Sequence, residues 1–125
     1  MPAATIWLLP TTLGGADVAA VIPEPVLERV RQLRYFLAEE PKSARAFLKL
    51  TGHPGPISQL RIGRLGNDTP AAELASMIDA VRGGIDAGVL SEAGCPGVAD
   101  PGATLVWLAH QAGLRVVPLP GPSSP

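Results

Sequence analysis

The chain has 125 residues, 46% of them hydrophobic, which is enough for one domain with its own core. Eleven acidic and ten basic residues leave a formal net charge of −1, so the chain lacks the overall basic excess that is typical of tight nucleic-acid binders. The single cysteine, Cys95, excludes an intramolecular disulfide, and no group of Cys and His has zinc-site spacing, so we expect no metal.

The first residues lack the features of a targeting signal. Residues 1–10 have neither a basic region nor a long apolar run, and no stretch reaches the length of a membrane span. We therefore expect a soluble, cytoplasmic protein. Fourteen glycines and fourteen prolines separate the apolar runs along the chain, which indicates a structured domain rich in loops.

Apolar runs and helical spacing predict a regular succession of strands and helices. In chain order we expect a strand at 5–10, a helix at 23–33, a strand at 34–39, a helix at 41–52, a strand at 57–62, a helix at 67–84, a strand at 88–92, a helix at 100–113 and a strand at 114–119. Strict alternation with short connections predicts an α/β fold in which about four helices flank a five-stranded, mainly parallel sheet.

The helix at 67–84 has the clearest pattern. Asp68 or Thr69 can cap its start, and Leu74, Ile78 and Val81 form one apolar face. For the last helix, we expect Asp100 to be the cap and Gly113 to mark the end.

Three loops rich in glycine and proline follow the first, fourth and fifth expected strands, at 10–15, 91–102 and 118–124. In open α/β sheets, ligands bind beyond the carboxyl ends of the strands. Rigid loops with little side chain suit a flat ligand with many hydrogen-bonding groups, such as an adenosine. Each loop taken alone also fits a tight turn. Neither a P-loop nor a G-x-G-x-x-G motif follows the first strand, which disfavours the common nucleotide-binding folds.

Candidate catalytic side chains are few. Cys95 lies in one of the three loops, but a nucleophile needs a base, and nothing in the sequence brings His53 or His110 near it, so a small polar filler is favoured. His110 falls late in a helix, where a surface role is the default. Glu39 and Glu40 end a strand and could act as acid or base, although a solvated pair of carboxylates is the simpler interpretation.

Two further groups are interpreted structurally. Arg29, Arg31 and Arg34 are expected to form a solvated helix face. Trp7 and Trp107 are too far apart in the sequence for a stacking platform, and we expect both to pack in or near the core.

Taken together, the loops resemble those of the tetrapyrrole-methylase-type S-adenosylmethionine (AdoMet) methyltransferases, in their amino-terminal half. Residues 10–15 read Pro-Thr-Thr-Leu-Gly-Gly, similar to the family's Pro-Thr-Pro-Leu-Gly-Asn. Residues 91–96 read Ser-Glu-Ala-Gly-Cys-Pro, similar to Ser-Asp-Ala-Gly-Thr-Pro, and Asp-Pro-Gly follows at 100–102. The family's Val-Val-Pro-Leu-Pro-Gly-Pro-Ser stands intact at 116–123. The nearest branch is that of the ribosomal RNA 2′-O-ribose methyltransferases, which modify a cytidine of the small-subunit RNA.

The resemblance implies a two-domain, AdoMet-dependent methyltransferase that binds the methyl donor in the cleft between its domains. Residues 1–125 would be the amino-terminal α/β domain, inactive alone, and the carboxyl-terminal domain would lie outside this chain. It also implies small-subunit ribosomal RNA or a small molecule as substrate, and a homodimer. The implied AdoMet-binding residues are Pro10, Leu13, Gly14, Glu92, Ala93, Gly94, Cys95, Pro96, Asp100, Pro120, Gly121, Pro122 and Ser123.

Three departures from the family pattern matter: one changes a residue of a cofactor loop, and two lie in regions that would face the substrate. Glu92 replaces the usual aspartate. Glu-Glu-Pro-Lys at 39–42 replaces Glu-Asp-Thr-Arg, and residues 64–68 replace a segment that contains histidine. Cofactor binding therefore carries over better than substrate identity, and no catalytic base is assigned. Two alternatives stay open: a methyltransferase acting on a tetrapyrrole or another small molecule, and a non-catalytic module for nucleotide binding or dimerisation.

Overall fold

The computed structural model describes residues 4–11, 22–92 and 101–119. Its strands are β1 (Thr5–Thr11), β2 (Tyr35–Ala38), β3 (Arg61–Arg64), β4 (Ala87–Glu92) and β5 (Arg115–Pro118). Its helices are α2 (Glu24–Gln32), α3 (Pro41–Leu50), α4 (Ala71–Arg82) and α5 (Pro101–Gln111), with a short 3₁₀ helix, η1 (Ile57–Gln59).

The five strands form one sheet in the order β3-β2-β4-β1-β5, and every described pairing is parallel. The central strands β1 and β4 pair over six residue positions, from Ile6 opposite Ala87 to Thr11 opposite Glu92. The predicted α/β class, the number of strands and the parallel arrangement are confirmed.

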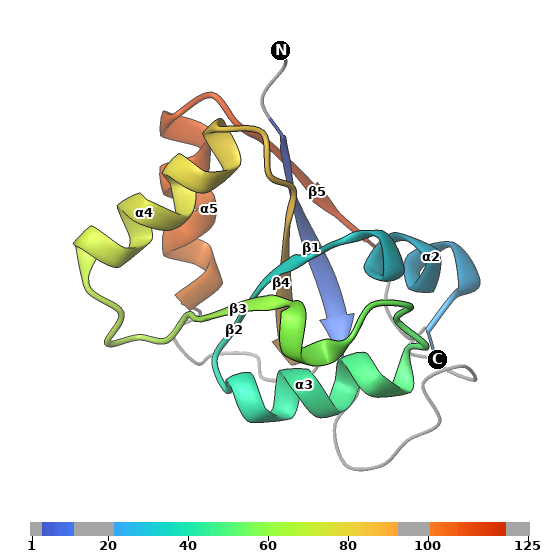
Figure 1. Cartoon of the computed structure of the whole chain (residues 1–125). Coiled ribbons are helices and arrows are strands. Elements are labelled where there is room, and N and C mark those ends of the chain that lie inside the picture. Colours follow the sequence, from blue (N-terminus) through green and yellow to red (C-terminus); the bar gives the residue numbers. More distant parts are fainter. Residues whose placement is uncertain (1–3, 12–21, 93–100, 120–125) are drawn as a thin grey trace, which may run out of the picture.

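Helices cover both faces of the sheet, because the strand side chains alternate between two hydrophobic cores. In β2, Tyr35 and Leu37 pack with the buried side chains of α4 and α5. Phe36 and Ala38 point the other way and pack with those of α2 and α3. Figure 1 shows α4 and α5 together on one side of the strands and α2 and α3 on the other.

The start of α4 differs from the prediction. Leu74, Ile78 and Val81 are buried, as expected, but neither predicted capping residue is the N-cap. Pro70 occupies that position and no side chain caps the helix. The Thr69 hydroxyl instead accepts a hydrogen bond from the Gly66 amide at 2.7 Å, so it serves the preceding turn.

The segment expected as a strand at 57–62 is divided. Its first three residues form η1, and strand β3 begins only at Arg61. Ile57 is half-buried and Leu60 is buried, and a 3₁₀ turn brings residues three apart to the same side. The alternation of apolar and polar residues that suggested a strand therefore reflects a turn followed by a shorter strand.

The ends of the last helix are partly confirmed. Gly113 follows α5 with a φ of +75°, a conformation that favours glycine, and so marks the end of that helix as expected. Asp100, the predicted cap of the same helix, lies outside the described residues.

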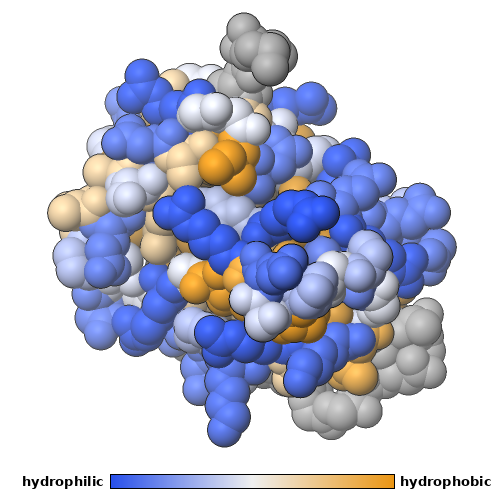
Figure 2. All heavy atoms as spheres, viewed as in Figure 1, coloured by the Kyte–Doolittle hydropathy of each residue, from blue (hydrophilic) through white to orange (hydrophobic). Residues whose placement is uncertain are grey.

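The face of the molecule seen in Figure 2 is mostly hydrophilic, with separate hydrophobic areas between the hydrophilic side chains. Trp107 is 60% exposed on α5, so the expectation that it packs in the core is wrong. α5 buries Leu105 and Ala109 instead, which leaves Trp107 on its outer side. None of the helices in the described ranges is both long and apolar enough to cross a membrane.

Candidate functional site

The carboxyl edge of the sheet brings together the strands from which the three predicted loops start. β1 lies between β4 and β5, with Pro10 opposite Ser91 and Leu8 opposite Pro118. Just beyond β5, the Leu119 amide donates a hydrogen bond to the Leu8 carbonyl at 3.0 Å. Because the three strands are parallel neighbours, their carboxyl ends lie at the same edge of the sheet.

Two predicted AdoMet-binding residues have a described backbone: Pro10 lies near the end of β1, and Glu92 is the last residue of β4. The other predicted residues lie outside the described part of the chain; they are Leu13, Gly14, Ala93, Gly94, Cys95, Pro96, Asp100, Pro120, Gly121, Pro122 and Ser123. The described residues therefore supply the frame of the candidate site, a row of adjacent strand ends. Such a row fits a ligand that is held by backbone groups of the following loops.

The neighbouring strand β2 ends at the same edge with the two candidate carboxylates. Glu39 and Glu40 both follow β2 directly and are exposed. Exposure agrees with the interpretation of these residues as a solvated pair, and neither has the buried environment that tunes a general base.

The segment after β3 forms a turn held by its own side chains. Arg64 donates a hydrogen bond to the Asp68 carboxylate at 2.7 Å, and both side chains are exposed. This hydrogen bond is the main reason that the pKa of Asp68 falls below, and the pKa of Arg64 rises above, its ordinary value. Thr69 closes the turn by donating from its hydroxyl to the Arg64 carbonyl at 3.4 Å. Within residues 64–68, where this sequence departs from the family pattern, the two charged side chains thus bond to each other.

A polar cluster that the sequence did not predict lies at the opposite, amino edge of the sheet. The Asp86 carboxylate accepts hydrogen bonds from the Thr5 amide at 2.8 Å and from the Trp7 indole at 3.2 Å. The Arg29 guanidinium lies 4.2 Å from the centre of the Trp7 ring. The cluster ties the start of β1 to the start of β4 and to α2.

Two of the three arginines expected on a solvated face are in fact engaged. Arg29 stacks on Trp7, which is half-buried, as expected of a residue near the core. Arg31 donates to the Thr51 carbonyl at 2.7 Å and pairs with Glu24 at 2.8 Å. Arg34 is exposed, as predicted. Arg34 lies beyond the end of α2, so the expectation that the three arginines form one solvated helix face is wrong.

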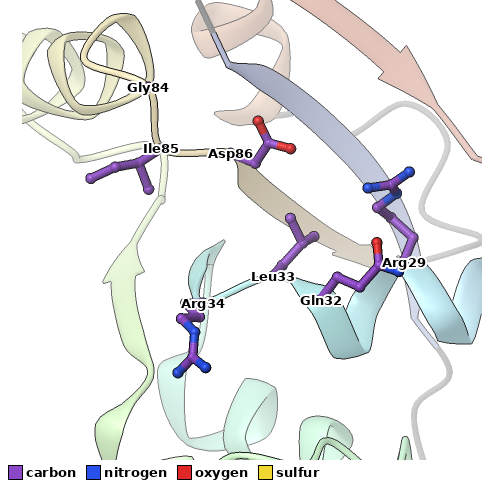
Figure 3. A pocket seen from close by; sticks show the side chains of 7 residues that line it. All are labelled: Arg29, Gln32, Leu33, Arg34, Gly84, Ile85 and Asp86. Carbon is purple, nitrogen blue, oxygen red and sulfur yellow. The ribbon is translucent and has the colours of Figure 1, made fainter.

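A shallow hollow of about 280 Å³ also lies at the amino edge (Figure 3). Its lining residues precede β2 and β4 and come from α2; they are Arg29, Gln32, Leu33, Arg34, Gly84, Ile85 and Asp86. Figure 3 shows Ile85 and Arg34 pointing away from the Asp86 carboxylate, so the polar groups do not converge on one point. This hollow is at the end of the sheet opposite to the predicted AdoMet site.

The two histidines differ in their surroundings. His53 Nδ1 accepts a hydrogen bond from the Gly55 amide at 3.1 Å, so Nε2 carries the proton that it shares with the Leu33 carbonyl at 2.7 Å. His110 is exposed in the last turn of α5, as expected. Among the described residues, no group of three or more His, Cys, Asp or Glu side chains could hold a metal ion.

Comparison with known sequences finds relatives along nearly the whole chain, although no protein-family profile matches it. The chain is 32% identical over 121 residues to the ribosomal RNA small subunit methyltransferase I of Pseudomonas aeruginosa, covering 97% of this chain and 40% of that protein. It is 31% identical over 117 residues to the protein of the same name from Escherichia coli O157:H7, covering 94% of this chain and 38% of the relative. It thus spans about 40% of the length of these curated relatives.

Solved structures share the fold. The uroporphyrin-III-C-methyltransferase of Thermus thermophilus superposes with a TM-score of 0.63 at 20% sequence identity, covering 97% of this chain and 49% of that structure. A conserved hypothetical protein of Aeropyrum pernix K1 superposes with a TM-score of 0.64 at 19% identity, covering 98% of this chain and 40% of that structure. At these identities the likeness concerns the fold alone, and it confirms the predicted fold class.

Proposed function

We propose that this chain is part of a tetrapyrrole-methylase-type methyltransferase, because it is related to such enzymes over nearly its whole length. The protein to which it belongs transfers a methyl group from AdoMet to small-subunit ribosomal RNA, at the 2′-hydroxyl of a cytidine. Residues 1–125 form the amino-terminal domain of that enzyme, and a second α/β domain completes the cleft for AdoMet. The enzyme acts in the cytoplasm as a homodimer.

The observation that supports the proposal is the adjacency of β4, β1 and β5 at their carboxyl ends. The sequence motifs at 10–15, 91–102 and 116–123 begin in the last residues of these strands and continue beyond them. Motifs that are far apart in the sequence therefore start from one edge of the sheet, where open α/β folds bind their ligands. The curated relatives, which are named as ribosomal RNA methyltransferases, direct the proposal toward an RNA acceptor.

AdoMet supplies a methyl group already activated by its bond to a sulfonium sulfur. The acceptor oxygen forms its new bond to the methyl carbon as the carbon–sulfur bond breaks, and the acceptor proton leaves to the solvent or to a base. Alignment of the two reactants can supply much of the rate enhancement for such a step. The role of this chain is therefore to hold and orient: the strand ends fix the loops, and the loop backbone holds the methyl donor.

No described side chain is well suited to be a general base. Glu39 and Glu40 are the nearest carboxylates to the carboxyl edge, and both are solvated. We therefore propose that positioning of the reactants dominates the rate enhancement. Replacing both glutamates by glutamine should then leave more than a tenth of the methyl-transfer rate, because general-base catalysis contributes about 100-fold or more where it operates. A loss of about 100-fold or more would identify one of them as the base.

The test uses the full-length protein with AdoMet that carries a labelled methyl group. Unmodified small-subunit ribosomal RNA is the substrate, and nucleoside mass spectrometry locates the label. The proposal predicts labelled 2′-O-methylcytidine at one position. Label on a base, label on a tetrapyrrole such as uroporphyrinogen III with none on RNA, or AdoMet binding without transfer to RNA would each contradict it. Light scattering of the same protein tests the homodimer, and a monomer would contradict that part.

A further inference from the structure

The outer face of α3 carries three cations in one line. Lys42, Arg45 and Lys49 are all exposed, and their spacing of three and four residues puts them on the same side of the helix. The first and last of them are about 10 Å apart along the helix axis. We call these three residues the α3 basic stripe.

Within α3 itself no acid accompanies the α3 basic stripe, although the exposed Glu39 and Glu40 directly precede the helix. Of the described helices, only α3 combines Lys and Arg with no Asp or Glu. Within residues 4–11, 22–92 and 101–119, none of the three cations pairs with a carboxylate. By contrast, Arg64 pairs with Asp68, and Arg61 lies 4.4 Å from the centre of the Tyr35 ring. Among the residues that the structure describes, the positive charge of the stripe is therefore not neutralised by an ion pair.

The helix holds the α3 basic stripe in place. On its inner side, Ala44, Phe47 and Leu48 are buried in the core against β2. Between the cations stands Ala46, which is exposed and small, so a partner can approach the helix surface closely. Cations on a rigid, packed element lose less freedom on binding than cations on a loop.

One end of the α3 basic stripe lies near the carboxyl edge of the sheet, where the candidate AdoMet site is. β2 is the neighbour of β4 in the sheet, and α3 begins three residues after the end of β2. Lys42 is thus near the carboxyl edge, and Lys49 is at the far end of the helix. Figure 1 shows α3 on the outer side of the molecule, and Figure 2 shows hydrophilic side chains over that region.

We infer that the α3 basic stripe binds the phosphate backbone of the RNA substrate and leads it toward the carboxyl edge of the sheet, an inference that rests on the proposed RNA acceptor. Lys and Arg on one rigid face release counterions from a polyanion, which gives affinity without reading the sequence. The net charge of −1 gives no sign of this surface, because acidic residues outside α3 cancel its positive charge in the total. An anionic membrane fits less well, since the apolar side of α3 is buried in the core.

The experiment measures RNA binding by the full-length protein as a function of salt. The test variant carries Lys42→Gln, Arg45→Gln and Lys49→Gln. The matched control carries Arg34→Gln, Arg82→Gln and Arg115→Gln, which remove the same charge at exposed positions away from α3. Protein-free small-subunit ribosomal RNA is the probe, fluorescence anisotropy gives the binding constant, and circular dichroism checks that each variant is folded.

We expect the test variant to reduce the slope of log K against log salt by about 2, because each lost contact with single-stranded RNA removes about 0.7. Its affinity at low salt falls about tenfold or more, and the control keeps the wild-type slope. An unchanged slope in the test variant, or an equal fall in the control, would overturn the inference. A loss of binding to phosphatidylserine vesicles with RNA binding intact would also overturn it.

A methylation assay on the same three proteins separates this inference from the proposed function. If wild-type protein methylates the RNA and the stripe variant binds RNA normally, the surface assignment fails and the function stands. If none of the proteins methylates RNA and only the stripe variant loses RNA binding, the function fails and the surface assignment stands.

Discussion

Thr11, the last residue of β1, lies directly opposite Glu92, the last residue of β4, in parallel register. The two central strands therefore end together, whereas β5, on the other side of β1, ends at Pro118 opposite Leu8, three positions before the end of β1. Loops that leave three adjacent strand ends can approach a common ligand without any long-range rearrangement. This relationship is the structural reason for proposing the carboxyl edge as one wall of an AdoMet site.

The centre of the sheet depends on Gly88. A Cβ atom at this position would lie 2.6 Å from Leu9 Cδ1, 3.0 Å from Leu33 Cδ1 and 3.2 Å from Phe36 Cδ1. Because three packed side chains would have to move, we predict that Gly88→Ala lowers the free energy of unfolding by about 1–3 kcal/mol. Urea denaturation measures the change, and an unchanged midpoint would show that the core can relax.

A matched glycine-to-alanine control is available at the end of α4. Gly83 has a φ of −76°, and a Cβ there would be no closer than 3.4 Å to the Ala80 carbonyl oxygen. Gly83→Ala is therefore expected to change the unfolding free energy by less than about 1 kcal/mol, in the stabilising direction. A large loss in both variants would mean that the close contacts of Gly88 are not the cause.

Asp86 is predicted to stabilise the amino edge through its two accepted hydrogen bonds. In Asp86→Asn, the amide NH₂ faces either the Thr5 amide or the Trp7 indole, and one donor loses its acceptor. We expect the free energy of unfolding to fall by about 1–3 kcal/mol. Asp79→Asn is the control, because its contact with Arg82 is long, at 4.0 Å, and exposed. That change should stay within about 0.5 kcal/mol; equal losses would refute the role of the cluster.

The Arg64–Asp68 pair predicts a pH dependence with a definite sign. The hydrogen bond from Arg64 lowers the pKa of Asp68 below its ordinary value of 3.8. A depressed pKa means that the pair stabilises the fold above about pH 4, and that this contribution is lost as the pH falls through the folded pKa. Carboxylate carbon NMR should show the Asp68 pKa below 3.8, rising toward it in Arg64→Gln. Arg82→Gln should leave the Asp68 pKa unchanged. An Asp68 pKa that is the same with and without the Arg64 guanidinium would contradict the role given to this hydrogen bond.

The two tryptophans are predicted to differ in access to water. Trp107 is 60% exposed, whereas Trp7 is half-buried under Arg29. In Trp7→Phe, the emission comes from Trp107 and should be quenched strongly by acrylamide. In Trp107→Phe, the emission comes from Trp7 and should be quenched less. Trp107→Ser should also change the unfolding free energy by no more than about 0.5 kcal/mol. Equal quenching of both tryptophans would contradict this placement.

The sequence was sufficient to predict the fold because its signals agree with one another. Leu74, Ile78 and Val81 repeat at helical spacing, and all three face the core. The prediction was wrong where one residue pattern fits both a strand and a 3₁₀ turn. Residues 57–62 alternate like a strand, yet Ile57 and Leu60 satisfy a 3₁₀ turn equally well. Trp107 was misplaced because a helix that is apolar on most sides does not reveal which side faces the sheet.

The predicted location of the AdoMet site stays a prediction, because most of its residues lie outside the described part of the chain. Motifs such as Val116 to Ser123 carry the resemblance to the family, whereas the order of the strands came only from the structure. The contact of Trp7 with Asp86 joins residues 79 positions apart, so no local pattern predicts it. The α3 basic stripe was missed for a different reason: its spacing is visible in the sequence, but the balanced total charge says nothing about how the charges are distributed.

The central claim is that the carboxyl edge, and not the hollow at the amino edge, binds AdoMet. Isothermal titration calorimetry of the full-length protein with AdoMet tests it most directly, in wild type, Gly94→Val, Cys95→Ser and Gln32→Ala. Gly94→Val alters the predicted site loop, Cys95→Ser is a mild change in the same loop, and Gln32→Ala alters the hollow.

We predict that wild type, Cys95→Ser and Gln32→Ala bind AdoMet with similar affinity, and that a folded Gly94→Val protein shows no binding heat. Full affinity in Gly94→Val, loss of affinity in Gln32→Ala, or no heat from wild type at millimolar AdoMet would contradict the account.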